Sequence, residues 1–123
     1  MKKKQKSLVF KIDVSIFCAE IWVCLGTTEQ KAEAIFKKKF EPNAVFPEFA
    51  PLKAGLFFSI ETLKGGVIWF PSTKPGVSVV THESIHAAFN ILENSGINVT
   101  AENQEPLCYV ADFIVGQIYK QIS

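Results

Sequence analysis

The stretch Val79-Val80-Thr81-His82-Glu83-Ser84-Ile85-His86-Ala87-Ala88-Phe89-Asn90-Ile91-Leu92 predicts an amphipathic helix that carries both histidines of the chain. Its apolar residues recur at helical spacing around the two histidines. Pro75 and Gly76 precede the stretch, and Asn94-Ser95-Gly96 follows it, with Gly96 suited to a left-handed C-terminal cap. These flanking signals predict where the helix begins and ends.

Inside this helix, His82-Glu83-Ser84-Ile85-His86 has the pattern H-E-x-x-H. Positions four apart lie one above the other on a helix, so both imidazoles can reach one cation. Glu83 lies one step round from His82, where its carboxylate can accept a proton from a metal-bound water. This spacing predicts a zinc site of the hydrolase kind. The alternative is two half-exposed histidines on an ordinary amphipathic helix.

A catalytic zinc usually takes three protein ligands and leaves one position for water. No third histidine exists, so we expect a downstream acid. The candidates are Glu93, Glu102, Glu105 and Asp112. Glu93 lies about two helical turns, or about 10 Å, beyond His86, which is too far to share the ion. Residues 103–113 read as the start of a second helix, with Asn103 as N-cap and Pro106 in the first turn. Packed antiparallel on the first helix, it would bring Glu105 over the histidines.

Residues 82–119 carry a family resemblance. H-E-x-x-H followed about twenty residues later by a helical glutamate resembles the gluzincin metallopeptidases, and above all their smallest members, the minigluzincins. The run Glu-Pro-Leu-Cys-Tyr-Val-Ala-Asp-Phe-Ile that begins at Glu105 is also similar to small metallopeptidases of bacteriophages and Bacteroidetes mobile elements, and more loosely to ImmA/IrrE-type proteases. The resemblance implies Zn²⁺ as cofactor, His82, His86 and Glu105 as its ligands, and Glu83 as general base and acid in peptide-bond hydrolysis.

The sequence departs from the family pattern at one position. Thermolysin-like members place an aspartate four residues after the ligand glutamate, where it orients a zinc-binding histidine. Here that position is Tyr109, and the nearest aspartate on that face is Asp112. The Tyr109 hydroxyl either assists the oxyanion or bonds to a ligand, or the ring only packs. Asp112 either orients an imidazole or is a surface carboxylate.

Composition indicates one domain over 1–123, with residues 1–6 as a flexible basic tail. Hydrophobic residues make up 48% of the chain, which is enough for a core, and the net charge of +1 argues against a basic nucleic-acid-binding face. No apolar run is long enough for a membrane span, and Lys11, Asp13 and Glu20 interrupt any signal-peptide core.

Cys18, Cys24 and Cys108 form no C-x-x-C pair. An odd number of cysteines without a signal segment favours a reducing cytoplasm, either of the cell or of a phage host, with the virion as the alternative for a phage protein. We expect Cys18 and Cys24 to be small buried apolar residues. Cys108 is the candidate for a fourth ligand if the metal site is closed and structural.

The expected fold class is α+β. We expect a small antiparallel sheet of about four strands, at 8–17, 21–25, 56–63 and 67–70, with a hairpin turn near residues 18–20. A helix over 29–40, capped by Thr27 or Thr28, backs the sheet, and the H-E-x-x-H helix and a C-terminal glutamate helix cover its other face. Residues 41–54 read as an ordered loop. The resemblance implies that strand 67–70 borders the cleft and can accept a peptide as an extra strand, with Trp69 either lining the cleft or in the core.

These patterns lead to a zinc-dependent metallopeptidase acting on a protein or peptide substrate. The alternative is a non-catalytic, metal-stabilised interaction protein or virion component of a phage or mobile element. A third hypothesis is a regulator that cleaves a repressor whose DNA-binding part lies on another chain.

Overall fold

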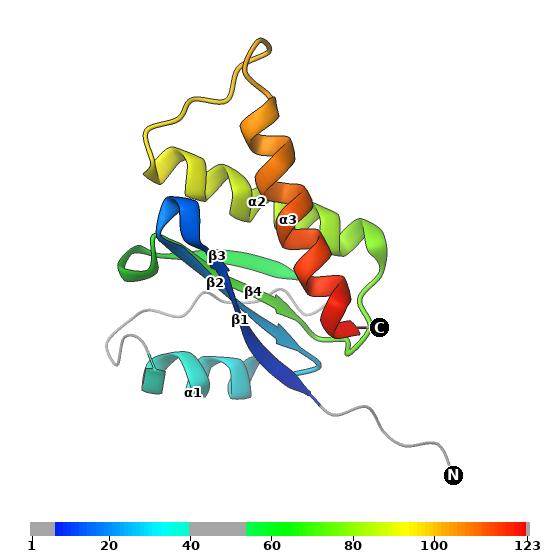
Figure 1. Cartoon of the computed structure of the whole chain (residues 1–123). Helices are drawn as coiled ribbons and strands as arrows, with labels where there is room; N and C mark the ends of the chain where they lie inside the picture. The colour runs from blue at the N-terminus through cyan, green and yellow to red at the C-terminus, as the bar shows by residue number, and fades with distance from the viewer. Residues whose placement is uncertain (1–6, 40–53, 123) are drawn as a thin grey trace.

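The computed structural model describes residues 7–39 and 54–122 of the 123-residue chain (Figure 1). The basic tail and all but residue 54 of the predicted loop at 41–54 lie outside the described residues. The helices and strands are β1 (Leu8–Val14), β2 (Ala19–Leu25), α1 (Glu29–Lys39), β3 (Leu56–Ile60), β4 (Gly65–Phe70), α2 (Val77–Asn94) and α3 (Glu105–Ile122), with 3-10 turns η1 (Ser15–Phe17) and η2 (Glu61–Leu63). The α+β class predicted from the sequence is confirmed.

The four strands form one mixed sheet in the order β1-β2-β4-β3. Each of the pairs β1–β2 and β3–β4 is antiparallel, whereas β2 and β4 run parallel. The expected all-antiparallel sheet is therefore wrong at its centre. The β1–β2 and β3–β4 hairpins meet through their second strands, β2 and β4. Because the two hairpins have the same orientation, these second strands run parallel.

Both hairpins turn in the same manner. A 3-10 turn is closed by a left-handed residue, Cys18 or Lys64, each with φ of 54°. The Cys18 N–H donates to Ser15 O at 3.0 Å, and the Lys64 N–H donates to Glu61 O at 3.0 Å. The turn predicted near residues 18–20 is confirmed, and β3 is shorter than the expected 56–63 because η2 takes its last three residues. Cys18 is exposed in this turn, contrary to the expectation that it is buried.

Helices cover both faces of the sheet, with α1 on one face and α2 and α3 on the other (Figure 1). Alternate residues of the central strands feed two cores. Ile21, Val23 and Leu25 of β2 join the core under α2 and α3. Cys24 of β2 joins the smaller core under α1, together with Ala32 and Phe36. This alternation is the period-two pattern of a strand buried on both faces.

Trp69 belongs to the core under α1, so of the two predicted positions the core is confirmed and the cleft is not. All six residues of β4 are buried because the strand lies inside the sheet, between β2 and β3. Trp69 is 6% exposed, and its indole Nε1 donates to Thr27 O at 2.9 Å. The strand order therefore makes β3, and not β4, an outer strand of the sheet.

The ends of the helices follow the expected signals with one exception. The Lys31 N–H donates to Thr28 Oγ1 at 3.2 Å, so Thr28 caps α1. Gly96, with φ of +75°, terminates α2 as predicted. The predicted N-cap Asn103 lies too early, because the first helical bond of α3 runs from Cys108 N–H to Gln104 O. None of the helices within the described ranges is both long and apolar enough to cross a membrane.

Candidate metal centre

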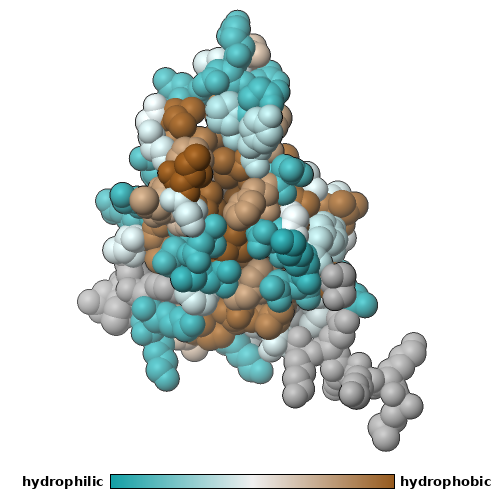
Figure 2. Space-filling view, in the orientation of Figure 1, coloured by the Kyte–Doolittle hydropathy of each residue, from teal (hydrophilic) through white to brown (hydrophobic). Residues whose placement is uncertain are grey.

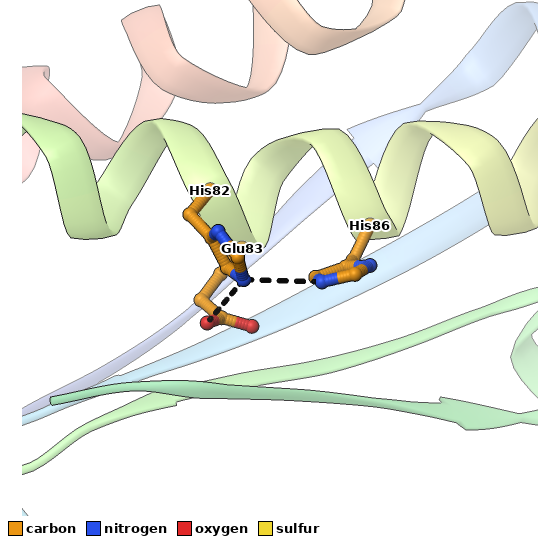
Figure 3. Close-up of side chains that lie close together, drawn as sticks. All are labelled: His82, Glu83 and His86. Carbon is orange, nitrogen blue, oxygen red and sulfur yellow. Dashed lines mark hydrogen bonds and ion pairs between the residues drawn. The ribbon is translucent and has the colours of Figure 1, made fainter. Parts of the chain in front are cut away.

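His82 and His86 lie one turn apart on α2 with both side chains exposed. Their Nε2 atoms are 3.2 Å apart, and the rings meet edge to face with centroids 4.8 Å apart. Figure 3 shows both imidazoles extending from the same side of α2 toward the strands below it. The predicted convergence of the two histidines on one helix face is therefore present.

Glu83 points into the space beside the two rings (Figure 3). Its side chain is buried, in contrast to the exposed histidines, and its Oε2 atom lies 3.9 Å from His82 Nε2. One ligand atom from each of His82, Glu83 and His86 lies within 4.8 Å of the other two. Three side chains of types that bind metals thus converge, and this group could hold a metal ion.

A cleft of about 280 Å³ separates this face of α2 from the segment that leads into the edge strand β3. The lining residues on the helix are His82, Glu83, His86 and Asn90, and those opposite are Gly55, Leu56, Phe57 and Ser59. The cleft is thus bounded by the possible metal ligands on one side and on the other by β3, whose outer side pairs with no strand among residues 7–39 and 54–122.

Gly55 brings the backbone close to Glu83. A β-carbon at Gly55 would lie 3.0 Å from Val79 Cγ1, 3.1 Å from Phe70 Cδ1 and 3.2 Å from Glu83 Cγ. Such contacts are tighter than ordinary van der Waals packing, so the absence of a side chain at Gly55 lets the Glu83 stem lie against the strand. This packing fixes the buried position of the carboxylate.

Asn90 is a cleft residue that sequence reasoning missed. It lies one turn beyond His86 and lines the same cleft. The Asn94 side-chain amide donates to Asn90 Oδ1 at 3.2 Å and to Lys64 O at 3.4 Å. With its oxygen accepting from Asn94, the Asn90 amide nitrogen is left as a donor. The sequence could have indicated this residue, because Asn90 follows His86 by the same four positions that separate His86 from His82.

The structure does not bring Glu105 into the His82–Glu83–His86 group. Glu105 is exposed at the first position of α3. The N-terminal end of α3, coloured orange in Figure 1, projects beyond α2, and α3 crosses α2 instead of lying along it. The side chains of the histidines extend toward the sheet, on the side of α2 away from α3 (Figure 3).

The other candidates on α3 are also exposed. Tyr109 is 71% exposed and lines a groove with η1, away from the cleft that holds the histidines. Cys108 and Asp112 are exposed and stand outside the group of possible ligands. Of the side chains that the sequence placed around a metal, the structure therefore brings together His82, Glu83 and His86, and it places Tyr109 at the groove beside η1.

The separation of the imidazole nitrogens suits a shared ion. Two ligands of one tetrahedral zinc, each at 2.0–2.1 Å from it, lie about 3.3–3.4 Å apart. The 3.2 Å between the Nε2 atoms is close to that value. The 3.9 Å between Glu83 Oε2 and His82 Nε2 is longer. The two histidines thus fit as ligands of one ion, with the carboxylate slightly farther out.

Comparisons with known proteins give no relative for this fold and site. No protein-family model matches the chain, and no match is found among curated proteins or among solved structures. The fold and the side chains themselves therefore carry the functional argument.

Proposed function

We propose that this protein is a zinc-dependent metallopeptidase in which His82 and His86 hold the ion. The observation that carries the proposal is the 3.2 Å between their Nε2 atoms at the rim of a cleft. Both imidazoles are exposed, so substrate and water have access to an ion held there. An open position of this kind is the property that separates a catalytic zinc from a structural one.

Glu83 is the proposed general base. A zinc ion lowers the pKa of its bound water toward about 7. The Glu83 carboxylate, 3.9 Å from His82 Nε2, is in reach of such a water without being as close as a ligand. It accepts the water's proton during attack on the peptide carbonyl and passes it to the leaving amine.

The proposed protein ligands are the two histidines, with water and a substrate oxygen in further positions. Glu105, the third ligand implied by the family resemblance, joins only if the first turn of α3 moves toward the cleft. Its exposure at the end of α3 leaves it accessible for such a change. Substitution of Glu105 distinguishes a site held by the two histidines alone from a site that also includes Glu105.

The proposed substrate is an extended peptide that adds to the outer edge of β3, an end strand of the sheet that the described residues form. Main-chain N–H and C=O groups of an edge strand recognise any extended peptide, and neighbouring pockets then select side chains. Leu56, Phe57 and Ser59 of β3 line the cleft with the histidines, so a peptide paired with β3 passes the proposed metal. The Asn90 amide, facing the same cleft, is the proposed donor to a substrate carbonyl.

The experiment that tests this proposal uses Glu83→Gln, which keeps the shape of the side chain but removes the base. Zinc-loaded parent and variant are incubated with a mixture of unstructured peptides, and new termini are identified by mass spectrometry. We expect unchanged zinc binding and a loss of cleavage of about 100-fold or more. Glu93→Gln, an exposed glutamate on the same helix, is the matched control and should cleave as the parent does. Absence of cleavage by the zinc-loaded parent, or undiminished cleavage by Glu83→Gln, contradicts the proposal.

A further inference from the structure

The strand β1 forms the edge of the sheet opposite β3, the strand that lines the cleft. Among residues 7–39 and 54–122, no strand pairs with the outer side of β1. Free edges offer a row of backbone donors and acceptors to another chain, and proteins usually protect them. The β1 edge carries Lys11 and Asp13 but no proline or bulge. In the described part of the chain, the outer backbone groups of β1 therefore face no other strand.

An apolar groove of about 530 Å³ adjoins the end of β1. Its apolar lining comes from η1 and α3 and includes Ile16, Phe17, Pro106, Tyr109, Val110 and Phe113. Ile16 is 85% exposed and Tyr109 is 71% exposed. Figure 2 shows hydrophobic side chains gathered around a hollow where η1 meets the first half of α3. Clustered apolar exposure of this kind marks an interaction surface.

The sequence of β1 is complementary to itself when two copies run antiparallel. With Ile12 opposite Ile12 of a second copy, Lys11 lies opposite Asp13 of that copy, and Asp13 lies opposite its Lys11. Opposite charges in directly opposed positions stabilise a strand pair. The same register brings Leu8, which is 37% exposed, toward Ile16 of the second copy. One register thus satisfies the charges and covers the exposed apolar side chains at both ends.

Two acidic side chains of the β1–β2 pair share Lys11 on this side of the sheet. Asp13 and Glu20 lie directly opposite each other in the β1–β2 register. Lys11 lies near both, with Nζ 3.4 Å from Asp13 Oδ1 and 3.9 Å from Glu20 Oε1, and the Lys39 ammonium lies 4.2 Å from the centroid of the neighbouring Trp22 ring. In the antiparallel register, each acidic pair gains the Lys11 of the other copy. This charge complementarity favours a second copy over an unrelated apolar peptide.

We propose that two copies of this chain associate through antiparallel pairing of their β1 edges, joining their sheets and covering the groove between η1 and α3. The arrangement has twofold symmetry, so each contact occurs twice. The dimer uses the edge opposite β3 and leaves the cleft at the histidines open. It is independent of metal binding.

The test is sedimentation equilibrium of the metal-free full chain in EDTA, over a range of about 1 to about 200 µM. We expect a mass that rises with concentration toward twice the 13.7 kDa of one chain. Ile16→Glu, at an exposed position, should raise the dissociation constant by about tenfold or more. Val77→Glu, also at an exposed apolar residue but on α2, is the matched control and should dimerise like the parent.

A charge exchange tests the register itself. Asp13→Lys places lysines opposite each other in the proposed pairing and should weaken the dimer. Adding Lys11→Asp in the same chain restores opposite charges and should recover it. A parent that stays at 13.7 kDa throughout overturns the proposal. So does an Ile16→Glu variant that dimerises like the parent, or a double variant as weak as Asp13→Lys alone.

Discussion

Gly55 packs directly against the stem of Glu83, and a β-carbon at Gly55 would lie 3.2 Å from Glu83 Cγ. The same β-carbon would meet Val79 and Phe70 at 3.0 and 3.1 Å. A residue just before the edge strand therefore holds the one buried acid of the proposed metal centre in place. This contact links the backbone path at the start of β3 to the position of the proposed base.

Gly55→Ala should displace Glu83 and so reduce hydrolysis more than zinc binding, because the atoms nearest to the added methyl belong to Val79, Phe70 and Glu83. Overpacking of this kind costs about 1–3 kcal/mol of unfolding free energy. Activity, zinc affinity and urea unfolding are measured on the same preparation. Gly116→Ala is the control: nothing lies within 4 Å of its β-carbon, and it should stabilise α3 by about 0.5–1 kcal/mol. Parent-like hydrolysis by Gly55→Ala would show that this contact does not position the base.

Trp69→Phe should lower stability and leave cleavage unchanged. The change removes the hydrogen bond that Trp69 Nε1 donates to the carbonyl oxygen of Thr27, which is itself a buried residue. The expected loss is about 2 kcal/mol of unfolding free energy. Urea unfolding measures the first effect, and peptide cleavage at a temperature where the variant is folded measures the second. A change in cleavage pattern would place Trp69 at the cleft after all.

Glu105→Gln distinguishes the two proposed ligand sets. Loss of a ligand, or of a side chain that orients one, weakens metal binding by about tenfold or more. Because Glu105 lies outside the His82–Glu83–His86 group, we expect its substitution to change zinc affinity by less than about threefold. Glu102→Gln, exposed shortly before α3, controls for the loss of one negative charge. A tenfold loss confined to Glu105→Gln would instead support the ligand set implied by the family resemblance.

The three cysteines should differ in reactivity. Cys18 and Cys108 are exposed and Cys24 is buried, so a thiol reagent should label two sites in the folded protein and three after denaturation. Labelled peptides identified by mass spectrometry check the assignment. Rapid labelling of Cys24 in the native state would contradict its place in the core under α1.

Burial raises the pKa of the Cys24 thiol from 9.0 to about 12. The folded state therefore keeps its proton where the unfolded chain has lost it, so this contribution to stability is complete below pH 9.0 and disappears as pH rises toward 12. Urea unfolding of the parent and of Cys24→Ala, compared between about pH 8 and about pH 10.5, measures it. The stability difference between the two proteins should shrink at the higher pH. A constant difference would contradict the pKa shift.

Local signals in the sequence predicted the helices and turns, whereas the order of the strands required long-range information. Gly96 ends α2 through its left-handed backbone, and Thr28 caps α1 through its side-chain oxygen, and a short stretch of sequence determines each signal. The position of β4 between β2 and β3 depends on which strands of two hairpins meet, and no local pattern encodes that choice. The expectation that strand 67–70 borders the cleft failed for this reason, whereas the core alternative for Trp69 is confirmed.

The candidate site, like the fold, was predictable from the sequence only in part. The convergence of His82 and His86 follows from helical spacing alone and was predictable. The placement of Glu105 and Tyr109 depends on how α3 crosses α2, which periodicity does not specify. Tyr109 consequently lies at the groove beside η1, where the structure gives it a different neighbourhood from the one expected.

The measurement that tests the central claim most directly is calorimetric titration of the metal-free protein with Zn²⁺, run in parallel on His82→Ala, His86→Ala and Glu93→Gln. The account predicts one zinc per chain for the parent and for Glu93→Gln, and no binding by either histidine variant in the same range. A parent that binds no zinc, or histidine variants that bind it as the parent does, would contradict the account.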